Sequence, residues 1–351
     1  MVELNGKKIL VTFLMHLGDL TLTTPFIHAL RKAAPDAHIT MLVDEKLKDV
    51  VLFNPYLDEV VTIDKKGRDN SILSLWACSR HLSKLDFDVL INLHPNERCS
   101  FIDAMTSVKL RTGTTHKIFK WFWDVFTPLD RSMHAADMYL DVLQQLGVQD
   151  LSSNGLEIFP GEEHFLEAEL FWQEQNITDQ DKLIGFNIGS AVPTKRWPPE
   201  RFAEVADIFA AKGYKTVFFG GPMDEEMVAE ATGYMQTRPI IATGHFAIGG
   251  LAAAMRRCCL IITNDSGPMH VAISQKVPIV AMYGPSNPKL YGPYTKDAVI
   301  VTAQPPCQGC ADGMKHSCDD LQCMSRMTVE QVVAAAEKML VKSTSSKIYC
   351  C

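Results

Sequence analysis

The sequence predicts an α/β protein made of two Rossmann-like domains, each with a parallel sheet and crossover helices. Three observations favour this class. Short β-branched runs alternate with amphipathic stretches, as βα units require. The alternation stops at a polar, glycine-bearing stretch, residues 147–160, and then begins again. The length of 351 residues exceeds one ordinary core and suits two domains.

The first half of the chain contains the elements of one doubly wound sheet. The expected strands are 8–14, 39–43, 60–63, 88–93 and 108–111. The expected helices are 20–33, 71–85, 98–107 and 135–146. This order of strands and helices is typical of a parallel sheet covered on both faces. We therefore place an N-terminal domain at residues 1–160.

The second half repeats the pattern after the linker. The expected strands are 183–187, 215–219, 239–242, 260–263 and 278–282. The expected helices are 199–212, 225–236, 248–257 and 268–274, followed by a last amphipathic helix at 329–341. We place the C-terminal domain at residues 161–327.

Composition excludes several classes of protein. Hydrophobic residues make up 47% and charged residues 21%, which are ordinary values for a globular chain. The formal net charge is −7 and no long basic stretch occurs, so we expect no nucleic-acid partner. The N-terminus is charged where a signal peptide needs an apolar core, and no run approaches the roughly 18 apolar residues of a membrane span. We expect a cytoplasmic protein.

Ten cysteines in such a chain are expected to be thiols or metal ligands rather than a disulfide framework. Cys78, Cys99, Cys258 and Cys259 occur in apolar or helical contexts and are expected to pack as small hydrophobes.

A second group of cysteines has a different character. It consists of Cys307, Cys310, Cys318 and Cys323. Four sulfur ligands with one close pair are compatible with a structural, tetrahedral zinc site. Reduced thiols or a local disulfide are the alternatives, and we expect no catalytic metal.

The most informative segment follows the expected strand 260–263. Asp265, Ser266 and Gly267 form a small-residue turn that leads into the helix 268–274. Ser266 or Asp265 can cap this helix, and Gly267 lets the backbone come close to a ligand. The N–H groups and the dipole of the helix attract an anion, so the segment predicts a phosphate site.

A second turn follows the expected strand 183–187. It contains a glycine, Ser190, and the adjacent cations Lys195 and Arg196. Trp197 with the following proline is expected to pack and stiffen this turn rather than touch a ligand.

Together these two segments resemble the donor-binding half of glycosyltransferase family 9, the ADP-heptose:lipopolysaccharide heptosyltransferases. The resemblance rests on the Lys-x-Trp-Pro stretch at 195–198 and the Asp-Ser-Gly-x-x-His stretch at 265–270. It extends through Leu17-Gly18-Asp19 with Thr24-Pro25, and through residues 283–288. These motifs span most of the chain in the expected order.

The resemblance implies a GT-B architecture, in which two Rossmann-like doubly wound domains face a central cleft. It also makes the C-terminal helix, 328–345, a candidate for packing back on the N-terminal domain.

Asp19 is the expected catalytic base. It follows the first strand and the turn 16–18, at the carboxyl end of the sheet. Inverting glycosyl transfer needs a group that takes the proton of the acceptor hydroxyl, and in the resembled family the aspartate of this motif is the proposed base. From position alone Asp19 could instead be the N-cap of the helix 20–33.

Lys195 and Arg196 are the expected ligands of the diphosphate. Negative charge grows on the leaving nucleoside diphosphate, so a cation held there stabilises the transition state, and no metal is then required. The family matches at Lys195, whereas Arg196 is often absent from its members. Ser190 occupies the place of a phosphate-contacting hydroxyl in the family.

The second phosphate segment supplies further contacts. Backbone donors at Ser266 and Gly267 are expected to meet phosphate oxygens, and Asp265 to bond sugar hydroxyls. His270, one turn into the helix, is a candidate for the phosphates or the sugar, with a purely structural histidine as the alternative.

Glu225 and Phe246 are the nucleotide candidates. Glu225 opens the helix 225–236, where an acidic residue binds ribose hydroxyls in nucleotide folds, but acids also favour a helix start. Phe246 precedes the helix 248–257 at the position where the family contacts adenine, and a core aromatic explains it equally well.

His94, Asn96 and Arg98 are the acceptor candidates, because they follow a strand at the expected cleft. Residues 111–126 mix basic and aromatic side chains. Such a stretch can bind an anionic lipid surface, and a half-buried helix is the alternative.

The preferred function is an inverting, metal-independent glycosyltransferase that moves a heptose from ADP-heptose to a lipid-linked glycan, a lipopolysaccharide core sugar, in transient contact with the inner membrane. Alternatives are another nucleotide sugar, a nucleotide-sugar epimerase of the same fold, and a non-catalytic nucleotide-sugar binder. A nicotinamide dehydrogenase is disfavoured, because the first turn lacks Gly-x-Gly-x-x-Gly. The sequence carries no signal for an oligomeric state.

Overall fold

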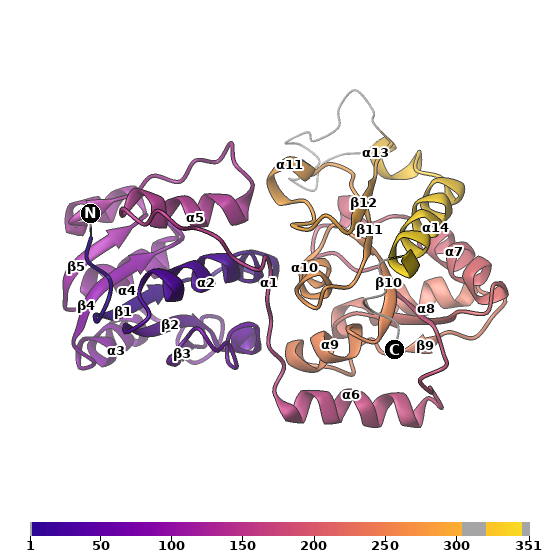
Figure 1. Cartoon of the computed structure of the whole chain (residues 1–351), viewed down its shortest axis with the longest axis horizontal. Coiled ribbons are helices and arrows are strands. Elements are labelled where there is room, and N and C mark those ends of the chain that lie inside the picture. Colours follow the sequence, from indigo (N-terminus) through magenta and orange to yellow (C-terminus); the bar gives the residue numbers. More distant parts are fainter. Residues whose placement is uncertain (1, 304–320, 346–351) are drawn as a thin grey trace. The chain divides into compact units, whose positions relative to one another are not determined.

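The computed structural model describes residues 2–303 and 321–345. The chain divides into two compact units, residues 1–159 and 160–351, one residue from the expected boundary. Figure 1 shows each unit as a twisted sheet with helices on its faces. The α/β class is therefore confirmed.

The first unit consists mainly of βα repeats. Its strands are β1 (Lys8–Thr12), β2 (His38–Asp44), β3 (Glu59–Ile63), β4 (Phe87–Asn92), β5 (Val108–Gly113) and β6 (Val125–Phe126). Its α-helices are α1 (Leu17–Thr21), α2 (Thr24–Ala33), α3 (Ile72–Ser83), α4 (Glu97–Met105) and α5 (Ala135–Gln145), with 3-10 turns η1 (Glu45–Val50) and η2 (Lys117–Phe122).

The second unit begins with a helix and then repeats the pattern. Its strands are β7 (Leu183–Asn187), β8 (Lys215–Phe219), β9 (Ile240–Ile241), β10 (Cys258–Asn264), β11 (Ile279–Met282) and β12 (Ala298–Val301). Its helices are α6 (Glu162–Glu174), α7 (Pro199–Ala211), α8 (Glu225–Tyr234), α9 (Ile248–Met255), α10 (Gly267–Ser274), α11 (Pro288–Tyr291), α13 (Gln322–Ser325) and α14 (Val329–Ser345), with η3 (Pro193–Lys195) and η4 (Pro222–Asp224).

The two sheets have the same topology. Their strand orders are β3-β2-β1-β4-β5-β6 and β12-β11-β10-β7-β8-β9, and every strand pair is parallel. In each sheet the strand order reverses between the first and fourth strands, which are β1 with β4 and β7 with β10. Ligands bind at such switch points, outside the carboxyl ends of the strands.

The expected single helix 20–33 is in fact two helices. The Oγ1 atom of Thr23 donates to the Leu20 carbonyl at 2.7 Å, and that of Thr24 donates to the Thr21 carbonyl at 2.8 Å. Threonine side chains that bond locally compete with the helical ladder. Pro25, which lacks an N–H, then occupies the first turn of the new helix. The break separates the short helix that carries Asp19 from α2.

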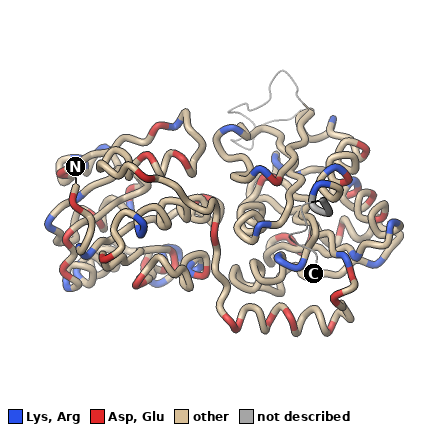
Figure 2. Tube along the Cα trace, viewed as in Figure 1, with Lys and Arg blue, Asp and Glu red and all other residues tan. Residues whose placement is uncertain are grey.

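Helix α6 was not expected, since the stretch after the linker contains many charges. Figure 1 shows it beside α9, against which it packs. Its buried side chains are Ala168, Phe171 and Trp172, spaced three to four residues apart as on one helical face. Figure 2 shows acidic residues along the rest of α6, and both signs of charge spread over each unit.

Helix α14 closes the core of the second unit. Val332, Ala336 and Met339 are at most 3% exposed and pack in the same cluster as Trp197 and Phe202. The apolar face of α14 is therefore used within this unit. A contact of this helix with the first unit would use its other residues, and stays a prediction.

The substitution Val332→Asp should destabilise the second unit by several kcal/mol, because it buries a carboxylate with no partner at a position that is 0% exposed. Ala334→Asp places the same group on the exposed side of α14 and is the matched control. Urea unfolding, followed by hydrogen exchange in peptides from β10 and β11, measures both. Equal effects of the two substitutions would contradict the packing described.

Candidate functional site

The switch point of the second unit joins two polar loops. Asn187, the last residue of β7, pairs in register with Thr263 of β10. Its Nδ2 atom donates to Thr263 Oγ1 at 3.1 Å and to Ser266 Oγ at 2.8 Å. The loop that begins α10 is thus tied to the neighbouring strand.

Lys195 and Asp265 form an ion pair across these loops. The Lys195 Nζ atom lies 2.8 Å from Asp265 Oδ2, and the side chains are 14% and 6% exposed. Ser286 donates a short hydrogen bond to the same carboxylate oxygen. The Ser190 hydroxyl donates to the Asp265 carbonyl at 3.4 Å. Four residues from three loops therefore converge, and burial strengthens their electrostatic interactions.

Asn264 and Trp197 hold these loops in place through hydrogen bonds to the backbone. The Trp197 backbone N–H donates to Asn264 Oδ1 at 3.1 Å, and Asn264 Nδ2 donates to the Ile188 carbonyl at 2.6 Å. Trp197 is fully buried, and its indole N–H donates to the Met327 carbonyl at 3.1 Å. Trp197 therefore stiffens the turn through packing, as expected.

The expected side-chain cap of α10 is wrong. Ser266 occupies the N-cap position, but its side chain makes no capping bond and instead accepts a hydrogen bond from Asn187. The first turn of α10, beginning at Gly267, thus has no side-chain acceptor at its N-cap. This leaves the positive end of the helix dipole suited to an external anion.

His270 is placed inside the unit. It lies one turn into α10 and is only 4% exposed.

Tyr283, which follows β11, is also buried, and its hydroxyl donates to the Tyr291 carbonyl at 2.8 Å. Burial raises the pKa of Tyr283 well above its ordinary value, and the nearby Asp265 carboxylate raises it further. Tyr283 is therefore a neutral support for Asp265 at physiological pH.

Arg196 extends toward a different part of the unit. Its Nε atom donates to the Ser190 carbonyl at 2.9 Å. The residue also lines a cavity of about 320 Å³ whose other walls come from the start of α7 and from η4 and α8, including Met223 and Glu226. Arg196 thus fixes the Ser190 loop, whereas Lys195 faces the carboxylate of the α10 loop.

The nucleotide candidates lie near the loop that follows β9. Glu225 is exposed, and its carboxylate lies against Gly244. Phe246 is half-buried and packs on Phe171 and His245, with ring centroids 5.0 and 4.7 Å apart. The described contacts do not join either residue to the Lys195–Asp265 pair.

Sequence reasoning missed Asp224, which connects two loops of this unit. Its Oδ2 atom accepts the Gly221 N–H at 2.9 Å. A Cβ atom added to Gly189 would lie 2.0 Å from Asp224 Oδ1, so a side chain at this position would force Asp224 to move. In the sequence, Gly189 after β7 was the signal from which this close approach could have been predicted.

In the first unit, Asp19 lies in the first turn of α1 and is half-buried. The N-cap of that helix is His16, so the alternative that Asp19 caps the helix 20–33 is wrong.

Lys65 was not predicted from the sequence as a residue of this site. Its Nζ atom donates to the Leu14 and Met15 carbonyls at 3.1 and 2.9 Å and pairs with Asp44 Oδ2 at 3.1 Å. Lys65 therefore holds the loop that precedes Asp19.

Two acceptor candidates line one cavity of about 460 Å³. Its lining residues are Leu14, Met15, Lys65, Pro95, Asn96, Glu97, Arg98 and His116. Asn96 caps α4 through its side chain, which accepts the Cys99 N–H at 2.7 Å. The lining combines apolar side chains with hydrogen-bonding groups and both signs of charge, which suits a sugar.

His94 is not among the residues that line this cavity. Its ring packs edge-on against Phe13, with centroids 5.9 Å apart. Burial, with smaller contributions from Arg131 and His16, lowers the pKa of His94 to about 4. His94 is therefore neutral at physiological pH and belongs to the support of the β4 loop.

The cysteines divide as follows. Cys99, Cys258 and Cys259 are buried, while Cys78 is half-buried, and burial raises the pKa of the Cys78 thiol to about 11. Cys323 is buried in the second unit. Cys307, Cys310 and Cys318 lie outside the described residues. Within residues 2–303 and 321–345, no group of three or more His, Cys, Asp or Glu side chains is arranged to hold a metal ion.

A buried carboxyl lies below the switch point of the first unit. Asp103 of α4 is 0% exposed, and its Oδ2 atom accepts the hydroxyl of Thr12 at 2.9 Å. Thr12 pairs in register with Asn92, so this contact sits where β1 and β4 meet. Burial raises the pKa of Asp103 to about 8, although its hydrogen bonds oppose the shift.

Two Rossmann-like units, one with a polar loop suited to an anion at its switch point, form the GT-B architecture. The model of glycosyltransferase family 9 (heptosyltransferase) matches residues 75–318, more than half of the chain. The chain belongs to this family and is a glycosyltransferase.

Relatives cover nearly the whole chain. A crystal structure of a family 9 glycosyl transferase from Veillonella parvula is 53% identical, with a TM-score of 0.93, and the match covers 97% of this chain and 99% of that one. The lipopolysaccharide heptosyltransferase 3 of Escherichia coli K12 is 24% identical over 94% of this chain and 97% of its own length. The structure of the E. coli ADP-heptose lps heptosyltransferase II has a TM-score of 0.78 at 20% identity, covering 96% and 99%.

The raised pKa of Asp103 predicts that this carboxyl contributes a loss of stability to the first unit as the pH rises from about 4 to about 8. In that window the folded state keeps the proton and the unfolded state releases it, so unfolding is favoured by up to about 1.4 kcal/mol per pH unit. Below about pH 6.5 the lowered pKa of His94 contributes in the opposite direction, so the effect of Asp103 is measured above that pH. Asp103→Asn cannot release a proton and should flatten this dependence. Hydrogen exchange in peptides from β1 and β4 at pH 7 and 8 measures it, and an unchanged slope in the variant would contradict the assignment.

Proposed function

We propose that this glycosyltransferase transfers a heptose from ADP-heptose to a lipopolysaccharide core sugar, with inversion at the anomeric carbon and without a catalytic metal ion. The lipid-linked acceptor places the reaction at the cytoplasmic face of the inner membrane. Support for the donor comes from the E. coli relative that is described as an ADP-heptose lps heptosyltransferase. Support for the acceptor comes from the relative described as lipopolysaccharide heptosyltransferase 3.

The observation that carries the proposal is the convergence of Lys195 with the start of α10 at the switch point of the second unit. Asp265 holds the Lys195 ammonium group by one of its three hydrogens, which leaves the others to bind phosphate oxygens. Backbone groups at Ser266 and Gly267 and the hydroxyl of Ser190 complete the proposed diphosphate site. Asp265 also has the chemistry to bind a sugar hydroxyl.

In the proposed reaction the acceptor hydroxyl attacks C1 of the heptose opposite to the diphosphate. The C1–O bond to ADP breaks as the new glycosidic bond forms, and the hydroxyl proton passes to the Asp19 carboxylate. The charge that grows on the diphosphate is stabilised by Lys195 and the α10 dipole, so these interactions lower the barrier rather than only strengthen binding.

The remaining assignments complete the substrate sites. Asn96 and Arg98, with Lys65 and His116, would bind the acceptor in their shared cavity. Glu225 and Phe246 would bind the ribose and adenine. Arg196 and His270 would act mainly by supporting the loops that bind the diphosphate, since Arg196 bonds the Ser190 carbonyl and His270 is buried.

Asp19→Asn should keep the affinity for ADP-heptose and lower turnover by about 10²- to 10⁴-fold, because an amide cannot accept the proton. ADP release in the presence of deacylated lipopolysaccharide measures turnover. Asp36→Asn, which changes an exposed carboxylate of the same unit, is the control and should behave as wild type. Turnover of Asp19→Asn equal to that of wild type would remove Asp19 from the role of base.

Lys195→Ala should weaken ADP binding by about ten- to a hundredfold, since a hydrogen bond to a charged group contributes roughly 1.5 to 3 kcal/mol. Calorimetry with ADP measures the affinity. Lys195→Gln keeps a hydrogen-bond donor for Asp265 and so separates the loss of charge from a change in loop structure. The exposed Lys182→Ala is the control. Unchanged affinity in both Lys195 variants would refute the diphosphate assignment.

A further inference from the structure

Most of the exposed large apolar side chains in the described part of the first unit gather in two short segments. Six of the nine belong to them, namely Ile72, Leu73 and Trp76 at the start of α3, and Ile118, Trp121 and Phe122 in η2. Trp121 is 95% exposed and Leu73 is 79% exposed. The four most exposed large apolar side chains in the described part of this unit all belong to these segments, 72–76 and 118–122. Concentrated apolar exposure of this kind marks an interaction surface.

Both segments begin beside the same turn of α4. Arg98 donates to the Lys65 carbonyl and, at 2.7 Å, to Oδ1 of Asn70, which lies two residues before Ile72. On the other side, the His116 backbone N–H donates to Ser100 Oγ at 2.9 Å. His116 is the N-cap residue of η2. The two apolar segments therefore flank the first turns of α4.

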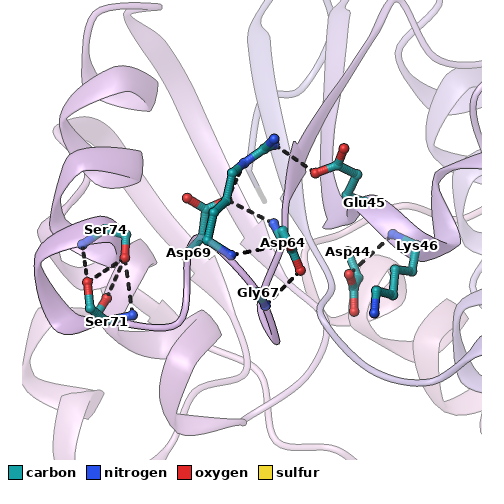
Figure 3. A network of polar contacts seen from close by, with 9 residues as sticks. Asp44, Glu45, Lys46, Asp64, Gly67, Asp69, Ser71 and Ser74 are labelled. Atoms are coloured by element: carbon teal, nitrogen blue, oxygen red, sulfur yellow. Dashed lines mark hydrogen bonds and ion pairs between the residues drawn. The ribbon is translucent and has the colours of Figure 1, made fainter.

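The segment 72–76 is held on an ordered loop. Figure 3 shows Asp64 accepting the Gly67 N–H and Asp69 accepting the Asp64 N–H, each at 2.9 Å. The same view shows the capping box of α3, in which Ser71 and Ser74 bond each other's backbone N–H at 3.1 Å. The exposure of Ile72 and Leu73 is thus fixed by the local hydrogen bonds.

The segment 118–122 is anchored in a similar way. Phe119 packs edge-on against Phe101, and Trp123 is 9% exposed with its indole N–H bonded to the Thr112 carbonyl at 3.0 Å. The half-buried Phe119 and the buried Trp123 lie on either side of Trp121 along the chain. The stretch 111–126 is not the single half-buried helix of the alternative, because it consists of the end of β5, the 3-10 turn η2 and β6.

Positive charge accompanies both segments. Lys117 and Lys120 lie in η2, which contains no acidic residue, and Arg80 lies 5.7 Å from the ring centroid of Trp76. Arg98 and Lys65 line the cavity beside the first turn of α4 together with the Glu97 carboxylate, and Lys65 is paired with Asp44. A chain with a net charge of −7 thus presents cations and exposed tryptophans together at one place. Anionic lipid headgroups attract the cations, and the headgroup boundary accepts tryptophan rings.

We propose that the segments 72–76 and 118–122 bind the interface of an anionic lipid bilayer, with Leu73 and Trp121 inserted at the headgroup level. The cavity beside the first turn of α4 then faces the membrane surface. The inference rests on the proposed function in one respect, namely that a lipid-linked acceptor would present its sugars to this cavity while its acyl chains stay in the bilayer.

Flotation of the full chain with vesicles tests the proposal without donor or acceptor. Wild type should bind vesicles of phosphatidylcholine mixed with phosphatidylglycerol, more weakly at high salt and more weakly with phosphatidylcholine alone. Trp121→Ser and Leu73→Ser should each lower the partition coefficient by about tenfold, as expected for losing one inserted apolar side chain. Leu166→Ser, on the exposed side of α6, is the matched control and should bind as wild type.

Three outcomes would overturn the proposal. The first is wild type that transfers heptose and yet does not float with anionic vesicles. The second is an equal loss of binding in the Leu166→Ser and Leu73→Ser variants. The third is a wild-type dimer in sedimentation that Trp121→Ser converts to a monomer, which would show that the segments join two copies of the chain. Vesicle binding that depends on Trp121, found in a protein without heptosyltransferase activity, would support the membrane surface and refute only the proposed function.

Discussion

The pairing of β7 with β10 is the constraint on which the proposed donor site of this glycosyltransferase depends. These strands are neighbours although the chain builds two other strands between them, so the loops that follow them meet at one edge of the sheet. Because Asn187 lies opposite Thr263, its amide reaches Ser266, and Lys195 reaches Asp265. A slip of one residue in this register would turn Asn187 away from its partners.

The first unit uses the same topology with different chemistry. Thr12 lies opposite Asn92 at its switch point, as Asn187 lies opposite Thr263. There the buried partner is the Asp103 carboxyl, and the loop above carries Asp19. The two copies of one fold thus place different polar groups at the equivalent edge. In the proposed function the second would bind the diphosphate through Lys195, and the first would accept a proton on Asp19.

In several places of this chain, hydrogen bonds from buried or paired side chains hold the loops that carry charged or exposed groups. Lys65 is held by two carbonyls and Asp44, and it fixes the residues that precede α1. Trp197 and Asn264 do the same for the Lys195 loop. No helix among the described residues is long and apolar enough to cross a bilayer. The exposed side chains of α3 and η2 are held by similar anchors, namely the capping box of Ser71 and Ser74 and the indole hydrogen bond of Trp123.

The elements themselves were largely predictable from local pattern. The strand 215–219 and the helix that begins at Pro199 follow from β-branched runs and from proline at a helix start. The errors also have local causes. Threonine side chains divide the helix 20–33, and the charges of α6 obscured its narrow apolar face. Strand β12 was missed because, with two of its four residues half-buried, it has neither clear alternation nor full burial.

The sequence by itself determined the α/β class, the division near residue 160, and the two loops with the residue types that suit a diphosphate. These depend on side-chain chemistry and periodicity over a few neighbouring positions. Only the tertiary structure decided that Ser266 bonds Asn187 rather than capping α10, that Arg196 turns toward α8, and that His94 is buried and neutral. It alone also revealed Asp224 and Ser286 as partners of these loops, and Lys65 as a partner of the loop that precedes Asp19. The physical reason is that such contacts join residues far apart in the chain, and parallel pairing across crossovers decides which of them meet.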